Sequence, residues 1–242
     1  MFELEHHKKV MTILNALRSD FFSEISAYFG GGTLLTLLYG EYRLSRDIDF
    51  ICPVGKGYRL LRSEIYDKNY KAVFKDFSNI TLPREIRADQ YGVRFAVMVE
   101  DIPIKFEIIA EGRISLESPE YYEWSTVPCL SFADSCCEKL LFNSDRWIDR
   151  AVESGDLIDL SILRLQSALP AKSVEKAESA YSVVKPLQDS IQFFQSEPDY
   201  RNMCFSSLQI QNRAKIIDGL DLLASDFGIP PTKRRNDEHP DY

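Results

Sequence analysis

Several features that would narrow the class of this protein at once are missing from its sequence. The five cysteines are an odd number and none has C-x-x-C spacing, so neither a disulfide framework nor a zinc site is predicted. No apolar run approaches the roughly 18 to 20 residues that span a bilayer, and the N-terminus lacks the layout of a signal peptide. We therefore expect a cytoplasmic protein with reduced thiols and no membrane association.

An excess of positive charge is also missing. The formal net charge is −8, which argues against a protein that coats nucleic acid nonspecifically. The charge is uneven, however: residues 43–113 hold 13 Lys and Arg against 11 Asp and Glu, whereas residues 114–242 hold 13 against 21. The slightly basic segment favours local binding of a polyphosphate or of a short nucleic-acid end.

Common catalytic motifs are absent as well. The sequence has no G-x-x-x-x-G-K-[ST], which excludes a P-loop NTPase, and it has no G-x-S-x-G, H-E-x-x-H or kinase signature. What remains is an ordinary globular composition, with 45% hydrophobic and 27% charged residues. A length of 242 residues suits one large domain or two small ones.

The hydrophobic periodicity changes near residue 130 and divides the chain. Before that point we predict a long helix over residues 5–28, a short buried helix over Thr33–Tyr39, and strands at Ile48–Cys52, Ala72–Phe77, Val93–Val99 and Ile104–Ile109. Beyond it we predict only helices, over about 131–144, 153–167, 173–193 and 206–224. The pattern predicts an α+β fold: a domain at 1–130 with a mixed sheet flanked by helices, a mostly α-helical domain at 131–228, and a flexible tail at 229–242.

Two aspartates stand one residue apart at the start of a predicted strand. Residues i and i+2 of a strand face the same side, about 6.5–7 Å apart, so Asp47 and Asp49 aim two carboxylates at one point while Ile48 and Phe50 turn into the core. Hard oxygen ligands at that spacing suit a pair of Mg²⁺ ions, as in phosphoryl and nucleotidyl transfer. Glu107 is the predicted third metal ligand, because the alternation in "PIKFEII" turns it away from the core.

Three glycines precede the short buried helix. Gly30–Gly32 let the backbone approach a ligand closely, and Thr33 is expected to cap the helix, whose positive dipole end then faces a triphosphate. The alternative is a flexible loop with an ordinary helix cap beside a solvated strand end. Together the glycines and the aspartates favour a phosphate-binding turn beside a metal site, with Mg²⁺ or Mn²⁺ as the cofactor.

Two stretches resemble the signature of the AbiEii/AbiGii toxin nucleotidyltransferases, a group within the DNA-polymerase-β-like nucleotidyltransferase superfamily: Gly31-Gly32-Thr33 and Arg43-Leu44-Ser45-Arg46-Asp47-Ile48-Asp49-Phe50. The helix "ADSCCEKLLFNSDRW" resembles a later motif of that family and maps its lysine to Lys139. The stretch "SGDLIDL" resembles its R-D-x-x-D-L helix and maps to Asp156 and Asp159, with Gly155 in place of the usual arginine. The resemblance spans roughly residues 28–165.

The resemblance implies a role for each matching residue. Lys139 would neutralise triphosphate charge, and Asp156 would position that lysine, the base or the acceptor. The implied catalytic residues are Asp47, Asp49, Lys139 and Asp156. The implied nucleotide-binding residues are Gly31, Gly32, Thr33, Arg43, Ser45, Lys139 and Asp159. The metal ligands would be Asp47, Asp49 and, from strand phase, Glu107.

The activity implied by the resemblance is transfer of a nucleoside monophosphate from an NTP to an acceptor, by the toxin of a bacterial toxin–antitoxin or phage-defence pair. A tRNA 3′ end is the expected acceptor, and a cognate antitoxin is the expected partner. Two alternatives stay open: a small-molecule nucleotidyltransferase of the antibiotic-modifying kind, and a noncatalytic binding module with the same fold. The intact Asp47 and Asp49 pair argues against the binding module, and the R-x-S-x-D-I-D form favours the toxin.

Two further expectations concern charged residues around these motifs. A basic series is expected to hold the RNA through phosphate contacts: Arg43, Arg46, Lys56, Arg59 and Arg62. The three histidines lie outside every motif and are predicted to be surface residues: His6, His7 and His239.

Overall fold

The computed structural model describes residues 2–239, and the chain divides into two compact units. Unit 1 comprises the chain up to Glu41 together with Ser45–Ser131, and unit 2 comprises Tyr42–Leu44 together with the chain from Phe132 on. The chain therefore enters unit 2 for three residues, returns to unit 1, and enters unit 2 again after Ser131.

Unit 1 is built on a five-stranded sheet in the order β1-β2-β5-β4-β3. The strands are β1 (Tyr28–Gly30), β2 (Ile48–Pro53), β3 (Arg87–Ala88), β4 (Gly92–Val99) and β5 (Ile102–Glu111). β2 runs parallel to β5, and the other neighbours are antiparallel. With its flanking helices this mixed sheet confirms the predicted α+β fold.

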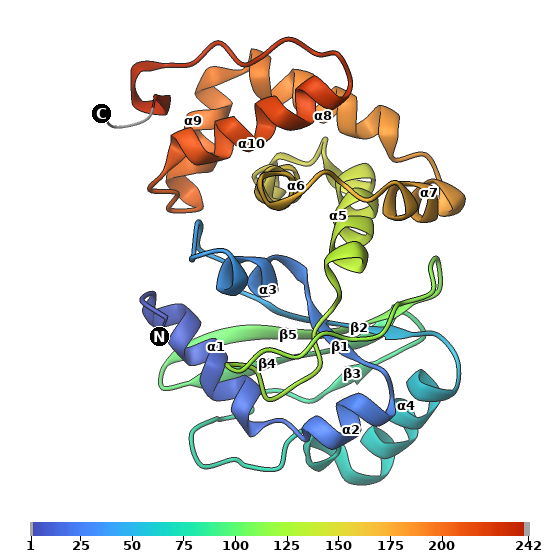
Figure 1. The fold of residues 1–242 in the computed structure, drawn as a ribbon. Helices are drawn as coiled ribbons and strands as arrows, with labels where there is room; N and C mark the ends of the chain where they lie inside the picture. The colour runs from blue at the N-terminus through green and yellow to red at the C-terminus, as the bar shows by residue number, and fades with distance from the viewer. Residues whose placement is uncertain (1, 240–242) are drawn as a thin grey trace. The chain divides into compact units, whose positions relative to one another are not determined.

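One face of the sheet carries the aromatic core of unit 1. Side chains alternate along a strand, and Phe50 and Phe106 of neighbouring strands stack with ring centroids 5.5 Å apart. Phe22 of α2 (Ser19–Glu24) packs on Phe50 from the same side. Figure 1 shows α2 and α4 (Lys56–Lys68) together on one side of the sheet and α3 (Gly31–Leu38) on the other. The side chains that alternate with Phe50 therefore face the side of α3.

The first predicted helix is in fact two helices, α1 (Glu5–Ala16) and α2. The chain turns between them at Leu17, which forms an isolated bridge with Phe74. The strand predicted at Ala72–Phe77 is wrong, because the 3-10 helix η1 (Asn69–Ala72) and that single bridge take its place.

Unit 2 is helical apart from its connections. Its elements are α5 (Phe132–Arg146), η2 (Arg150–Val152), α6 (Gly155–Gln166), α7 (Ala171–Ala180), α8 (Val184–Ser196), α9 (Pro198–Ser207), α10 (Arg213–Asp226) and η3 (Asn236–Glu238). The single helix predicted over 173–193 is therefore two, α7 and α8. α10 packs closely on α6 at Gly219. A Cβ at this position would lie only 2.1 Å from the carbonyl oxygen of Ser161 on α6.

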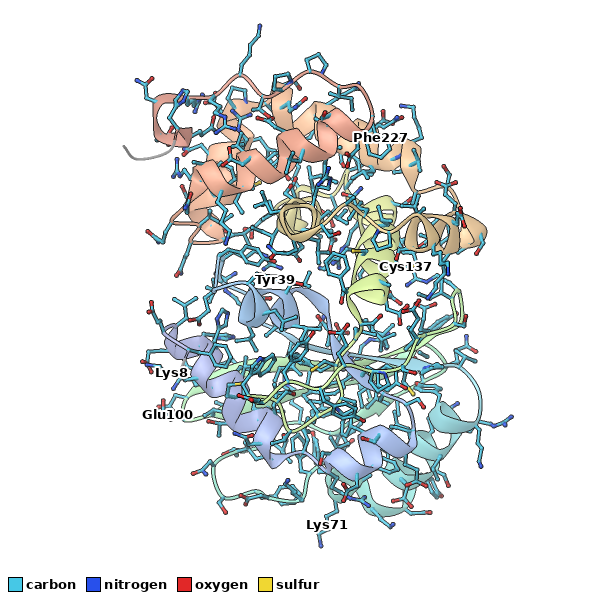
Figure 2. All side chains as sticks on the ribbon, viewed as in Figure 1. Lys8, Tyr39, Lys71, Glu100, Cys137 and Phe227 are labelled. Atoms are coloured by element: carbon cyan, nitrogen blue, oxygen red, sulfur yellow. The ribbon has the colours of Figure 1, made fainter. Side chains whose placement is uncertain are left out.

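The cysteines are all buried, and none of them forms a disulfide: Cys52, Cys129, Cys136, Cys137 and Cys204. Figure 2 labels Cys137, which lies on α5. Burial raises the pKa of Cys52 to about 12, so this thiol is unreactive at neutral pH. Across residues 2–239, no helix is long and apolar enough to cross a membrane.

The segment after α10 is held on unit 2. Arg201 of α9 is fully buried and donates from Nε and Nη2 to the carboxylate of Glu238, at 2.5 and 2.9 Å. The Thr232 amide donates to the carboxylate of Asp221 at 2.7 Å. A buried guanidinium needs a carboxylate beside it. Residues 229–239, whose composition predicts a flexible tail, thus supply this carboxylate, and the flexibility of the tail stays a prediction. Residues 240–242 lie outside the described part of the chain.

Candidate active site

Two strands of unit 1 bring the predicted carboxylates to one face of the sheet. Asp49 of β2 is the register partner of Glu107 on β5, and Asp47 lies two residues earlier in the same phase. Asp49 is also paired with Gly30, the last residue of β1. The register therefore sets Glu107 beside the aspartates, where strand phase predicts it.

The absence of a side chain at Gly31 leaves space for the Asp49 carboxylate. The φ of Gly31 is +68°, a conformation that favours glycine, and a Cβ there would lie 2.5 Å from Oδ2 of Asp49. Gly31 is also the first residue of α3, and no side chain caps this helix. The first amides of α3 are thus left for an acceptor from outside the helix, next to the carboxylate of Asp49.

Thr33 is not the helix cap that the sequence predicts, because Gly30 occupies the cap position. The Thr33 side chain is fully buried, and its hydroxyl lies 2.8 Å from Oγ of Ser45 and contacts the carbonyl oxygen of Asp47. The Ser45 side chain is buried as well. Both hydroxyls therefore hold the backbone that leads into β2, and the nucleotide contacts that the resemblance implies for Thr33 and Ser45 stay a prediction.

His7 is fully buried, and its predicted surface position is wrong. Its Nδ1 lies 2.7 Å from Oε1 of Glu41, and its Nε2 accepts a hydrogen bond from the Ser45 amide at 3.3 Å. Because Nε2 is an acceptor, the proton is on Nδ1 and the ring is neutral. Burial lowers the pKa of His7, although Glu41 favours its charged form. His7 thus ties α1 to the backbone two residues before Asp47.

Burial opposes the charge of the Asp47 carboxylate. It is half-buried, and within residues 2–239 its side chain accepts no hydrogen bond. Burial raises the pKa of Asp47; Lys105 opposes this rise, and Glu107 adds to it. A half-buried carboxylate without a donor is suited to a cation that comes from outside the chain.

Two cations that sequence reasoning missed lie on the same face. The ammonium of Lys105 on β5 is 2.5 Å from Oε2 of Glu107, and Nε of Arg94 on β4 is 3.1 Å from Oε1. By the register of β2 and β5, Lys105 lies level with Asp47. The signal was present in the sequence, because Lys105 stands two residues before Glu107 and shares its strand phase.

The donor set fits a hard divalent cation in its chemistry and in part of its arrangement. Asp47, Asp49 and Glu107 offer carboxylate oxygens, which Mg²⁺ and Mn²⁺ prefer. Within residues 2–239, however, no three His, Cys, Asp or Glu side chains are arranged to hold a metal ion. Both oxygens of Glu107 are bound by Lys105 and Arg94. The two aspartates therefore fit a metal, and Glu107 would join them only after releasing a cation.

The residues of the later motifs meet inside unit 2. Lys139 of α5 lies 2.8 Å from Oδ1 of Asp156 and 2.7 Å from Oδ2 of Asp159, both on α6. Arg43 donates from Nε and Nη2 to the two oxygens of Asp159, at 2.7 and 2.8 Å. Tyr42 donates its hydroxyl to Asp159 at 2.6 Å. We call these five residues the buried ion network.

Opposite charges balance one another throughout the buried ion network. Burial alone would raise the pKa of Asp159, but Arg43 and Lys139 hold it well below its usual value. Burial also opposes the charge of Lys139, and the two aspartates hold its pKa above the usual value. Arg43 and Asp159 bind each other here, and the nucleotide contact that the resemblance implies for both stays a prediction.

Asp156 of α6 is bound by Arg146, an arginine of the preceding helix α5. The resembling family has an arginine at the position of Gly155, next to Asp156 in the chain. Here Arg146, in the last turn of α5, donates from Nε to Oδ2 of Asp156 at 2.7 Å and from Nη2 to Oδ1 at 3.1 Å. Sequence reasoning missed Arg146 because ten residues and a helix boundary separate it from Asp156.

The basic residues expected to hold RNA are dispersed. Lys56, Arg59 and Arg62 are exposed on α4. Figure 1 shows α4 on the side of the sheet opposite to α3, and strand alternation turns the aspartates to the side of α3. Arg43 is buried in unit 2. Of the series, Arg46 is both exposed and adjacent to Asp47.

The architecture of the chain is that of the nucleotidyltransferases. A solved structure of a candidate nucleotidyltransferase from H. pylori aligns with a TM-score of 0.50 and 19% identity, over 89% of this chain and 89% of that one. At this identity the likeness shows the fold alone. JHP933 from Helicobacter pylori also aligns, with a TM-score of 0.39 and 15% identity over 86% of this chain and 100% of that chain.

The sequence matches the family described as "Nucleotidyl transferase AbiEii toxin, Type IV TA system" over residues 12–213. The chain therefore belongs to the AbiEii family of nucleotidyltransferase toxins, as its motifs predict. Membership in a toxin–antitoxin family implies an antitoxin as partner. No curated protein matches the sequence.

Proposed function

We propose that this protein transfers a nucleoside monophosphate from an NTP to the 3′ hydroxyl of an RNA, with tRNA as the acceptor, and that it depends on Mg²⁺ or Mn²⁺. The observation that carries the proposal is the pair of aspartates in unit 1. The Asp47 carboxylate has no hydrogen-bond donor within residues 2–239, and Asp49 packs against Gly31, where a Cβ would collide with it. Such an arrangement is suited to binding a cation and a phosphate rather than to stabilising the fold.

In this reaction the acceptor oxygen forms a bond to the α-phosphorus, and the bond from that phosphorus to the pyrophosphate oxygen breaks. A divalent cation, when bound, supplies positive charge at the α-phosphate and favours the deprotonated acceptor. Asp47 and Asp49 would hold that cation. The free amides at the start of α3 bind phosphate oxygens, because the first N–H groups of a helix have no partner within it.

The acceptor is proposed from the toxin family and from local charge. A chain with a net charge of −8 attracts RNA only where positive side chains are concentrated. Arg46 and Lys105 are exposed, and both lie beside the aspartates within unit 1. A 3′ end brings a hydroxyl and only a few phosphates, which suits so small a basic area.

Transfer of label tests the proposal. The protein is incubated with Mg²⁺, total RNA and each of the four α-labelled NTPs in turn, and the products are separated by size. Label in tRNA-sized bands, lost in EDTA and in Asp47→Asn, is the expected result. Label confined to small molecules would instead identify a small-molecule nucleotidyltransferase. Folded wild-type protein that labels nothing would be a binding module.

A growth assay tests the same activity in cells. Expression of the wild-type chain without an antitoxin should arrest growth, and Asp47→Asn at the same protein level should not. Equal arrest by both chains would show that toxicity does not depend on the aspartates. Protection of the host from phage by the wild-type chain and its antitoxin would support the proposed role in defence.

A further inference from the structure

Lys105 is a cation on the sheet face that carries the three predicted metal ligands. We propose that Lys105 is the resident counter-ion of the acidic cluster, defined as Asp47, Asp49 and Glu107, and that the site takes up its divalent cation together with the nucleotide. The inference rests on the proposed function, because it assumes that the acidic cluster holds a metal.

The position of Lys105 supports this role. Its ammonium is 2.5 Å from Oε2 of Glu107, and the register of β2 and β5 sets it level with Asp47. The charge of the ammonium acts on Asp47 and Asp49 as well as on Glu107. One ammonium thus interacts with all three carboxylates of the acidic cluster.

The side chain of Lys105 is also free to move. It is 54% exposed, whereas the Glu107 side chain is 16% exposed. An ammonium on a flexible four-carbon stem changes partners without a change in the backbone. Lys105 is therefore suited to being displaced, and Glu107 is suited to staying in place as a ligand.

Charge explains why the nucleotide is needed. The acidic cluster has three carboxylates, while Lys105 and Arg94 each bring one positive charge against Glu107. A free metal ion must compete with Lys105 for Glu107. A triphosphate offers its own oxygens to the ammonium, so Lys105 moves onto phosphate and Oε2 of Glu107 becomes available to the metal.

Metal binding without nucleotide is the first test. Mn²⁺ is titrated into the purified full chain, and free Mn²⁺ is measured by electron paramagnetic resonance. We expect Lys105→Met to bind Mn²⁺ about tenfold more tightly than wild type, because the competing charge is gone. Lys105→Arg should stay close to wild type. The matched control is Lys68→Met on α4, whose lysine is 50% exposed and lies 2.7 Å from Glu64. It should leave the affinity for Mn²⁺ unchanged.

Nucleotide binding is the second test. If Lys105 moves onto phosphate, Lys105→Met should weaken binding of the productive NTP in the presence of Mn²⁺ about tenfold, and Lys105→Arg should restore most of it. Calorimetry with each NTP measures this binding without the transfer reaction. The KM for NTP should rise in parallel, with a smaller change in kcat.

The outcomes separate the two proposals. Equal Mn²⁺ affinity in wild type, Lys105→Met and Lys105→Arg would overturn the role of Lys105 and leave the metal-dependent reaction standing. No Mn²⁺ binding by the wild-type chain, with or without NTP, would overturn the metal-dependent function and the role of Lys105 with it. A folded Lys105→Met, shown by an unfolding temperature near that of Lys68→Met, is required for either reading.

Discussion

The two units treat their charged side chains in opposite ways. In the buried ion network of unit 2, Asp159 is bound by Tyr42, Arg43 and Lys139, and its pKa is held well below the usual value against the effect of burial. In the acidic cluster of unit 1, burial raises the pKa of Asp47, and Lys105 opposes this rise only through its charge. Within residues 2–239 the Asp47 side chain accepts no hydrogen bond. Charges that satisfy one another stabilise a fold, whereas an unsatisfied carboxylate marks a place for a ligand.

The largest effect is expected on activity, from substitutions of the aspartates of unit 1. Asp47→Asn or Asp49→Asn should lower nucleotidyl transfer by about 10³-fold or more, because each removes a metal ligand. The free energy of unfolding at pH 7 should stay the same or rise. Folded Asp47 binds a proton more readily than the unfolded chain does, so its charge costs stability above both pKa values.

Transfer assays and urea unfolding measure the two effects together. Asp101→Asn is the control, because Asp101 is exposed in the turn between β4 and β5. It should change neither quantity. Full activity in both site variants would show that the aspartates bind no catalytic metal.

The second effect is expected in stability, at Lys139. Lys139→Met should lower the free energy of unfolding by about 3–5 kcal/mol, because it leaves Asp156 and Asp159 buried with less positive charge. Chemical denaturation measures the loss. Lys185→Met, which breaks an exposed ion pair with Asp189 on α8, should cost less than about 0.5 kcal/mol.

The motif of Lys139 also implies that this lysine neutralises triphosphate charge, and a second measurement separates this predicted role from the effect on stability. NTP binding must be measured at a temperature where Lys139→Met remains folded. Unchanged NTP binding in such a sample, with the expected loss of stability, would make Lys139 a structural residue of unit 2.

The third effect is expected at Gly31. Gly31→Ala should lower transfer about 10- to 100-fold, because the new Cβ displaces the carboxylate of Asp49, and small displacements of a catalytic group are costly. The control is Gly40→Ala. Gly40 has a φ of +83°, but nothing lies within 4 Å of its added Cβ. Both variants should lose about 1 kcal/mol of stability from the positive φ, and a similar loss of activity in both would count against the collision.

A smaller effect is expected in the pH dependence of stability, at His7. The pKa of His7 is below 6.5 in the folded chain, so between pH 7.5 and 5.5 the unfolded chain takes up a proton that folded His7 resists. Wild type should therefore lose about 1 kcal/mol more than His7→Gln over this range. Urea midpoints at the two pH values give the difference, and parallel curves would refute the lowered pKa.

The smallest effect is expected on α4. Replacement of Lys56, Arg59 and Arg62 together by Ala should change the KM for RNA less than about twofold and leave its salt dependence unaltered, since phosphate contacts set that dependence. Figure 1 shows α4 on the side of the sheet opposite to α3, the side that Asp49 faces by strand alternation. Arg46→Ala is the comparison and should raise the KM for RNA. A flattened salt dependence in the triple variant would place part of the RNA on α4.

Local patterns carried most of what could be predicted. Strand phase sufficed to set Asp47, Asp49 and Glu107 on one face, because a period of two is fixed by the backbone. Strand phase also sets Lys105 on that face. A single lysine in a strand is usually solvated, so the sequence alone gives no reason to assign it to the site. The break at Leu17 depends on a bridge to Phe74, a partner that no local pattern can supply.

Partners distant in sequence account for what was missed in the polar residues. His7 is buried by contacts with Glu41 and Ser45, more than 30 residues away. In the sequence, Arg43 looks like a phosphate-binding residue. Its structural role is revealed only by its ion pair with Asp159. In the same way, the segment 229–239 is polar and proline-containing, but Glu238 is the partner of a buried arginine.

The assignment of Tyr42–Leu44 to unit 2 has a consequence for folding during synthesis. Arg43 is synthesised 116 residues before its partner Asp159. The Leu44 amide is synthesised longer still before Leu208, whose carbonyl oxygen accepts its hydrogen bond. At a synthesis rate of about 5–20 residues per second, the first interval alone lasts about 6 to 23 s. A nascent chain thus carries an unburied arginine in the middle of its first unit until most of the message has been read. Premature termination before Asp159 leaves that arginine without its carboxylate.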